Sequence, residues 1–142
     1  MQAANENSAP DRDILANDPA RAEDLRDFNN RLRSVSEQAR KLLTHISELA
    51  YHGRGQQRQP DTAYLPELHE SCGLDVDAMY GLLKELAKAR LIEIEEKYPF
   101  EDVRILPTKS GWNALADVAR IAEIQKTPLR EILVDLRFEL LP

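Results

Sequence analysis

The sequence has one cysteine, Cys72, so the chain cannot form an internal disulfide bond or a metal site built from several cysteines. Its three histidines, His45, His52 and His69, do not occur at the spacings of metal-binding pairs. The chain also lacks a glycine-rich phosphate loop and a nucleophile motif. We therefore predict that the protein is not an enzyme and has no catalytic residues, no metal and no cofactor.

Long apolar runs are also absent. No stretch approaches the roughly 20 apolar residues of a membrane-spanning helix, and the N-terminus lacks a basic start followed by an apolar segment. The 42% hydrophobic and 31% charged fractions are typical of a soluble globular protein, and 142 residues suffice for one domain. These features predict a cytoplasmic protein with no membrane partner.

Positive charge is scarce. The net charge of −6 argues against strong non-specific binding to a polyanion. The charge is uneven, because residues 31–60 hold six basic and two acidic side chains, a local charge of +4. We therefore expect a local basic surface on an otherwise acidic protein.

The N-terminal third predicts a disordered tail followed by a long helix. Residues 1–18 are rich in Asn, Ala, Ser and Asp and show no apolar period. After Pro19, no proline or glycine intervenes up to His52, and apolar residues recur with alternating gaps of three and four. These residues are Leu25, Phe28, Leu32, Val35, Ala39, Leu42, Ile46 and Leu49.

This heptad pattern allows two interpretations. The helix either lies along the core of its own domain or extends beyond the domain and pairs with a second chain. A helix over residues 19–52 would be about 50 Å long, which exceeds the diameter of a domain of this size. We therefore favour pairing and predict a homodimer. The candidate interface residues in this helix are Leu25, Phe28, Leu32 and Val35.

The middle of the chain predicts two short helices in succession. The first has apolar residues at Leu65, Leu68 and Cys72 and stops at Gly73. The second begins at Asp75 or Asp77, either of which can cap it, and ends near residue 90.

A β-hairpin is predicted after these helices. Residues 91–95 and 103–106 form the two strands of the hairpin, and residues 96–102 form its tip. A polar loop is predicted before the helices. In the loop at 53–60, Arg54 and Arg58 either contact phosphate or are simply solvated.

Two helices are predicted after the hairpin. Thr108 caps the first, in which Ile121 and Ile124 lie toward a second face. Pro128 starts the last helix, whose apolar residues spread nearly all round and are expected to be covered by a partner subunit. The candidate interface residues there are Leu133, Leu136, Phe138 and Leu140.

Four stretches of the middle region together resemble a known family. They are Leu65–Leu68 with Cys72–Leu74, Met79–Leu86, Ala89–Ile92, and Arg104–Gly111 leading into a helix. In order and spacing they are similar to the winged-helix domain of MarR-type bacterial transcription regulators. The resemblance covers residues 65–115, roughly the middle third of the chain.

This resemblance implies a fold that is mostly α-helical with a small β-hairpin. Residues 19–142 would form one domain, in which the winged helix-turn-helix at 62–109 is flanked by long N- and C-terminal dimerisation helices at 19–52 and 109–142. It further implies a DNA-binding transcription regulator, with a recognition helix over about 75–88 in the major groove and a wing at 97–102 near the minor groove. The sequence identifies no small-molecule effector.

The candidate DNA contacts are the polar side chains of the recognition helix and the basic residues around it. They are Tyr80, Lys84 and Lys88, together with Arg54, Arg58, Lys97, Arg104 and Lys109. The start of the recognition helix and the wing tip, however, are rich in Asp and Glu, where DNA readers present Arg or Lys. The alternative is therefore a winged-helix protein–protein interaction module that no longer binds DNA.

Overall fold

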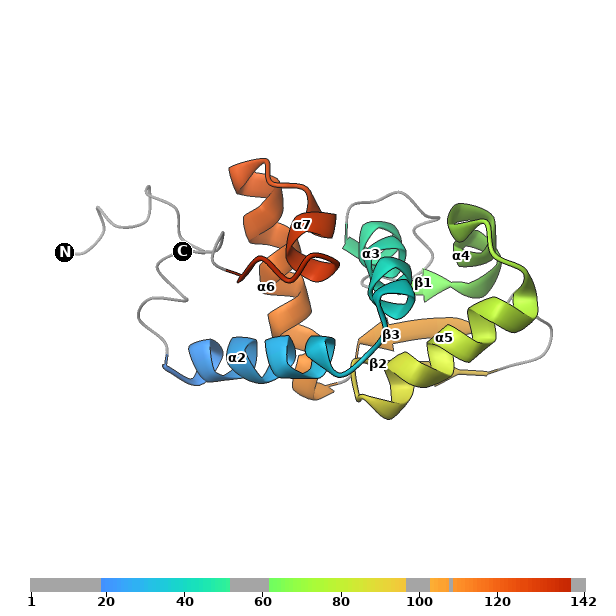
Figure 1. Ribbon diagram of the computed structural model, residues 1–142, viewed down its shortest axis with the longest axis horizontal. Helices are drawn as coiled ribbons and strands as arrows, with labels where there is room; N and C mark the ends of the chain where they lie inside the picture. Colours follow the sequence, from blue (N-terminus) through green and yellow to red (C-terminus); the bar gives the residue numbers. More distant parts are fainter. Residues whose placement is uncertain (1–18, 52–61, 97–102, 108, 139–142) are drawn as a thin grey trace.

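The computed structural model describes residues 19–51, 62–96, 103–107 and 109–138 (Figure 1). These ranges are mostly helical and contain a small antiparallel sheet of three strands, as predicted in coarse outline. The elements in chain order are α2 (Pro19–Arg33), α3 (Glu37–Tyr51), β1 (Ala63–Tyr64), α4 (Leu65–Cys72), α5 (Val76–Lys88), β2 (Ile92–Glu95), β3 (Arg104–Pro107), α6 (Lys109–Gln125) and α7 (Leu129–Leu133).

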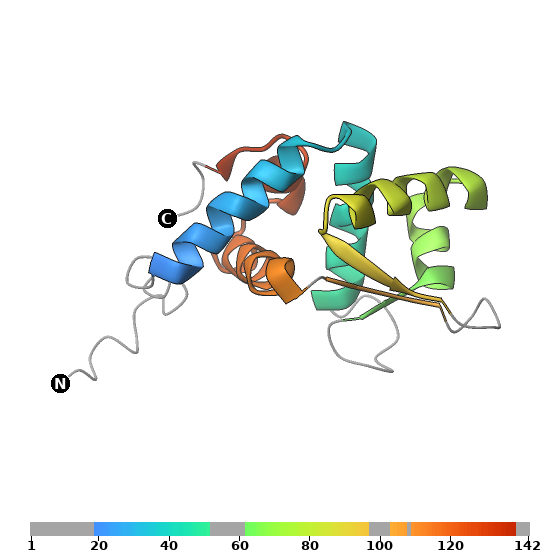
Figure 2. The ribbon, with the colours of Figure 1, turned by 90° about the horizontal axis from the view of Figure 1, so that it is seen from below.

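The prediction of one helix over residues 19–52 is wrong. Helix α2 ends at Arg33, the chain turns through residues 34–36, and α3 begins at Glu37 in a different direction (Figures 1 and 2). The Ser36 hydroxyl accepts a hydrogen bond from the backbone N–H of Ala39 at 3.2 Å, as a helix N-cap does. The 50 Å rod that suggested pairing with a second chain is therefore absent.

Helix α3 lies at the centre of the fold. It packs against α4 and α5 on one side and against α6 and α7 on the other, while α2 packs mainly along α6 (Figure 1). Its buried residues include Ala39, Leu42, Leu43 and Ile46, none of which is more than 1% exposed. The second half of the heptad pattern thus lies on the core of its own chain.

The sheet has the strand order β1–β3–β2, with both pairs antiparallel. Ile105, on the central strand, pairs with Ala63 on one side and Ile94 on the other. The predicted strands at 91–95 and 103–106 are confirmed to within one residue, whereas the two-residue strand β1 was not predicted. The predicted hairpin tip lies outside the described residues, except for Glu96.

The turn between α4 and α5 was predicted correctly. Gly73 ends α4 in the left-handed conformation, with φ of 72°, which a side chain would strain. Of the two candidate caps for α5, Asp75 fills the role, because its carboxylate accepts a hydrogen bond from the backbone N–H of Ala78 at 2.8 Å. Met79, Leu83 and Leu86 then turn the apolar face of α5 inward.

The residues assigned to a dimer interface lie mostly within the fold of the single chain. Phe28, Leu32, Val35 and Leu133 are buried in its core, and Leu25, Leu136 and Phe138 are partly buried against it. The Phe28 and Phe138 rings meet edge to face, with centroids 6.5 Å apart. Leu140 and the tail at residues 1–18 lie outside the described residues.

The last predicted helix is much shorter than expected. Helix α7 spans only Leu129–Leu133, and Leu136 has a positive φ of 60°, which a continuous helix cannot contain. In the described part of the chain, no helix is long and apolar enough to cross a membrane.

Candidate nucleic-acid interface

The outward face of α5 is a row of exposed residues that changes charge along its length. Asp77, Gly81, Lys84 and Lys88 recur at gaps of four, three and four, which places them on one side of a helix. The row is acidic at the start of α5 and basic at its end. Tyr80, the third residue predicted for this helix, is half-buried and packs against the core.

The sheet adds acidic rather than basic side chains to this region. Glu93, Glu95 and Glu96 are exposed on and beside β2. Arg104, predicted to hold phosphate, forms an ion pair with Glu95 on the neighbouring strand, and its side chain is only 16% exposed. Its positive charge is therefore balanced within the sheet.

Four other predicted DNA contacts are not among the side chains that the structure describes. Arg54, Arg58 and Lys97 lie outside the described residues. Lys109 begins α6, but its side chain is not among those the structure describes. Of the predicted set, only Lys84 and Lys88 are thus seen together on an exposed face.

The sequence did not predict that the end of α2 lies beside the end of α5. Exposed basic residues occur on both segments: Arg33 at the end of α2, and Lys84, Lys88 and Arg90 on and just after α5. The guanidinium of Arg31 donates a hydrogen bond from Nη1 to the backbone oxygen of Arg90 at 3.1 Å, which joins the two chain segments. The positive charge of residues 31–60 predicted basic side chains in this region, but the contact between Arg31 and Arg90 joins residues 59 positions apart and had no signal in the sequence.

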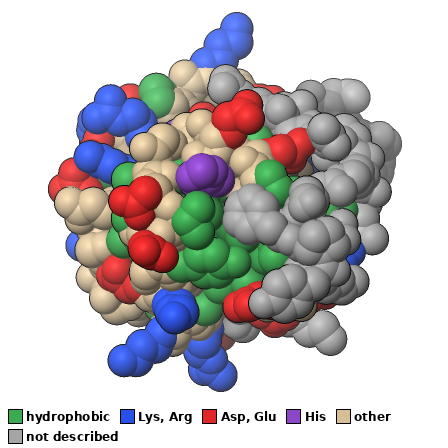
Figure 3. Space-filling view, turned by 90° about the vertical axis from the view of Figure 1, so that its right-hand side faces the viewer, with side chains coloured by type: hydrophobic (Ala, Val, Ile, Leu, Met, Phe, Trp, Pro, Cys, Tyr) green, Lys and Arg blue, Asp and Glu red, His purple; other side chains and the backbone are tan. Residues whose placement is uncertain are grey.

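The opposite end of α5 is different in character. Figure 3 views the end of the molecule with α4 and the start of α5, where hydrophobic side chains gather beside a histidine and several acidic groups. Val76, in the first turn of α5, is 38% exposed, which is high for a large apolar residue. This end combines apolar surface with negative charge, which does not suit contact with phosphate.

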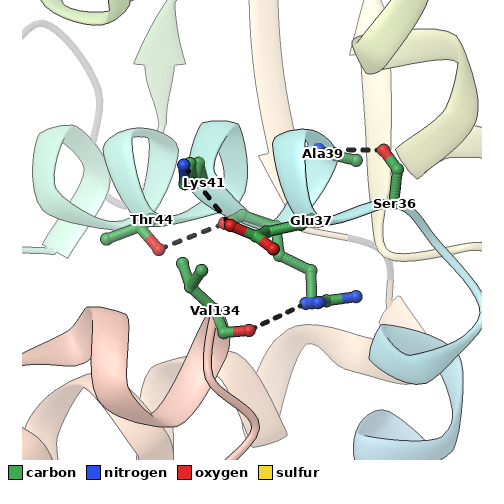
Figure 4. Close-up of polar contacts among 7 residues, drawn as sticks. Ser36, Glu37, Ala39, Lys41, Thr44 and Val134 are labelled. Carbon is green, nitrogen blue, oxygen red and sulfur yellow. Dashed lines mark hydrogen bonds and ion pairs between the residues drawn. The ribbon is translucent and has the colours of Figure 1, made fainter.

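A cleft of about 490 Å³ lies between α3 and α7. Lys41, His45 and Arg130 contribute basic side chains to its lining, and Glu48 contributes a carboxylate. The side chain of Arg40 crosses between the same helices, where its Nε donates to the backbone oxygen of Val134 at 3.1 Å (Figure 4). In the described residues, no group of histidine, cysteine and carboxylate side chains is arranged to hold a metal ion.

Comparisons with models of protein families, with curated proteins and with solved structures found no match for this chain.

Proposed function

We propose that the protein is a winged helix-turn-helix transcription regulator that binds double-stranded DNA as a homodimer. The observation that carries the proposal is the path from α3 through β1, α4, α5 and β2 to β3, with a sheet of order β1–β3–β2. Two helices joined by a short turn and followed by a hairpin present the second helix outward, as DNA-binding helix-turn-helix units do.

Charge decides which part of α5 would meet DNA. Lys84 and Lys88 lie on its exposed face and can neutralise phosphates, whereas Asp77 at its start would meet a groove lined with negative charge. Affinity would then come mainly from phosphate contacts in the second half of the helix. We expect weak binding with a shallow dependence on salt, because few lysines and arginines are available.

The test is a salt titration of binding to a fluorescently labelled random duplex, measured by anisotropy. The double variant Lys84→Glu with Lys88→Glu is expected to lose binding at low salt. The matched control is Lys126→Glu with Arg130→Glu, which changes the net charge equally at exposed positions just after α6 and on α7. Equal losses in both variants, or no binding by the natural sequence at low salt, would contradict the proposal.

A second candidate function is favoured by the surface at the start of α5. The apolar and acidic end of the molecule in Figure 3 suits a basic, apolar protein segment better than it suits DNA. In this alternative the winged helix is a protein-interaction module. Val76→Asp would then abolish binding of the partner protein but leave any DNA binding by Lys84 and Lys88 intact.

A further inference from the structure

The outward row of α5 has two different halves. Its second half carries Lys84 and Lys88, which suit phosphates, whereas its first half presents only Asp77 and Gly81. Asp77 is the second residue of α5, at the N-terminal end with which helix-turn-helix units contact base edges. The residues at these two positions therefore decide what the first half of the helix recognises.

The two aspartates at the start of α5 differ in their contacts. Asp75 caps the helix, because its carboxylate accepts a hydrogen bond from the backbone N–H of Ala78 at 2.8 Å. Asp77 is exposed and forms neither a hydrogen bond nor an ion pair with any residue that the structure describes. Asp75 already supplies a cap and a negative charge to the helix N-terminus, so the start of α5 does not require a second carboxylate there.

Gly81 has no contact among the described residues that requires a glycine. It lies in the interior of α5, its φ is not in the left-handed region, and a Cβ atom there would meet nothing within 4 Å. Glycine destabilises the interior of a helix relative to alanine. The missing side chain leaves the backbone of α5 bare between Asp77 and Lys84, which suits close approach by a surface outside the chain.

We infer that Asp77 determines sequence specificity by accepting a hydrogen bond from the N4 amino group of a cytosine in the major groove, and that Gly81 lets the helix approach closely enough. This inference rests on the proposed DNA binding and names the base that α5 reads. Guanine and thymine present acceptors in the major groove, and adenine places its N7 acceptor beside its amino group. Cytosine alone presents an amino group without a neighbouring acceptor, so a carboxylate favours it over the other three bases.

The spacing along α5 fits this division of roles. Gly81 lies about 6 Å and Lys84 about 10 Å beyond Asp77 along the helix axis, at ~1.5 Å per residue. Phosphate contacts of the lysines set the register of the helix on the duplex, and this register brings Asp77 to one base position. The negative charge of Asp77 weakens binding to duplex DNA in general, and the loss is recovered only where a cytosine faces it. The acidic start of α5 therefore contributes selectivity rather than affinity.

The test is a selection by the full chain from duplexes with a randomised core, followed by sequencing of the bound fraction. Asp77→Asn keeps the size of the side chain but pairs best with adenine, whose N6 and N7 match the two groups of an amide. The matched control is Asp135→Asn, the same substitution at an exposed position after α7. Circular dichroism verifies that both variants are folded.

The natural chain and Asp135→Asn are expected to favour cytosine at one position of each half-site, by about tenfold over the other bases. In Asp77→Asn, the preference at that position alone should change to adenine. Two results would overturn this inference and leave the proposed function standing: a natural chain that binds DNA without favouring cytosine, or Asp77→Asn binding all duplexes more tightly with its base preference unchanged. Absence of DNA binding by the natural chain overturns both.

Discussion

Glu85 and Ser36, 49 positions apart in the chain, are joined by two hydrogen bonds that set where α3 begins. The carboxylate of Glu85 accepts from the Ser36 backbone N–H and from its hydroxyl, and that hydroxyl accepts from Ala39. A free N–H at the start of a helix needs an acceptor, and here α5 supplies it. The bend between α2 and α3 is thereby coupled to the proposed recognition helix.

Replacing this carboxylate should destabilise the fold. Glu85→Ala leaves the part-buried N–H of Ser36 without its acceptor, which costs about 1–3 kcal/mol in the free energy of unfolding. Glu85→Gln keeps one acceptor oxygen and should recover part of the loss. Urea denaturation followed by circular dichroism measures both.

The matched control for Glu85 is Lys84→Ala, one residue away on α5 and exposed. Its effect on the free energy of unfolding should be within about 0.5 kcal/mol, because alanine is an equally good helix former. A loss in Glu85→Ala no larger than that of the control would show that the bonds to Ser36 contribute nothing to stability.

Local patterns predicted the middle of the fold because local chemistry decides it. Gly73 and Asp75 mark the turn between α4 and α5 by requirements that each residue meets alone, a left-handed backbone and a helix cap. The two longer strands followed from alternation of apolar residues within four or five positions. The exposed lysines of α5 followed in the same way from helical periodicity.

The features that were missed depend on contacts between distant segments. The heptad spacing runs unbroken through Leu32, Val35 and Ala39, since Leu32 and Ala39 are buried on either side of the bend and Val35 is buried within it. Ser36 can cap a helix, but the Glu85 bonds that help to set the start of α3 come from 49 residues further along the chain and have no local signal. The contact between the ends of α2 and α5 was missed for the same reason, because Arg31 and Arg90 meet only through tertiary structure.

Arg40 should contribute to stability far more than its neighbour Lys41. Its guanidinium donates to the backbone oxygen of Val35 at 2.7 Å and to that of Val134 at 3.1 Å, so one side chain joins the α2–α3 bend to the end of α7. Arg40→Lys supplies a single charged group that cannot make both bonds, and the expected loss is about 1.5–3 kcal/mol.

Thermal unfolding of Arg40→Lys and of Lys41→Ala tests this prediction. Lys41 pairs with Glu37 at 3.4 Å, and both side chains are about 60% exposed, so its removal should cost less than about 0.5 kcal/mol. Similar losses in the two variants would rule out the role assigned to Arg40.

Replacement by alanine should change the free energy of unfolding in opposite directions at two glycines. A Cβ atom at Gly73 or at Gly81 would meet no atom within 4 Å, so backbone conformation alone decides the outcome. Gly73 has a positive φ, and Gly73→Ala should cost about 1–2 kcal/mol. Gly81 lies inside α5, and Gly81→Ala should raise the free energy of unfolding by about 0.5–1 kcal/mol.

Denaturant midpoints of these two variants provide the comparison. Destabilisation by Gly81→Ala would indicate that the helix is not continuous at that position. If Gly81→Ala is more stable yet binds DNA less tightly, the added methyl group obstructs a surface that approaches the outward face of α5.

The proposed homodimer makes a prediction that separates folding from association. Phe28 is 1% exposed within a single chain and contacts Phe138, so Phe28→Ala should cost about 3–5 kcal/mol whether or not a partner is present.

Ile124 is 53% exposed on α6, whereas Ile121 beside it is buried. Ile124→Lys, which suits the last turn of α6, should therefore leave the stability of the single chain within about 0.5 kcal/mol but weaken association, because it places a charge where a second chain would cover the isoleucine. Sedimentation at several micromolar concentrations and denaturation at two concentrations a hundredfold apart measure the two effects.

A natural chain that sediments as a monomer throughout would contradict the dimer. A loss in Phe28→Ala that disappears at high concentration would show instead that Phe28 acts at the interface between chains, as its place in the heptad pattern first suggested.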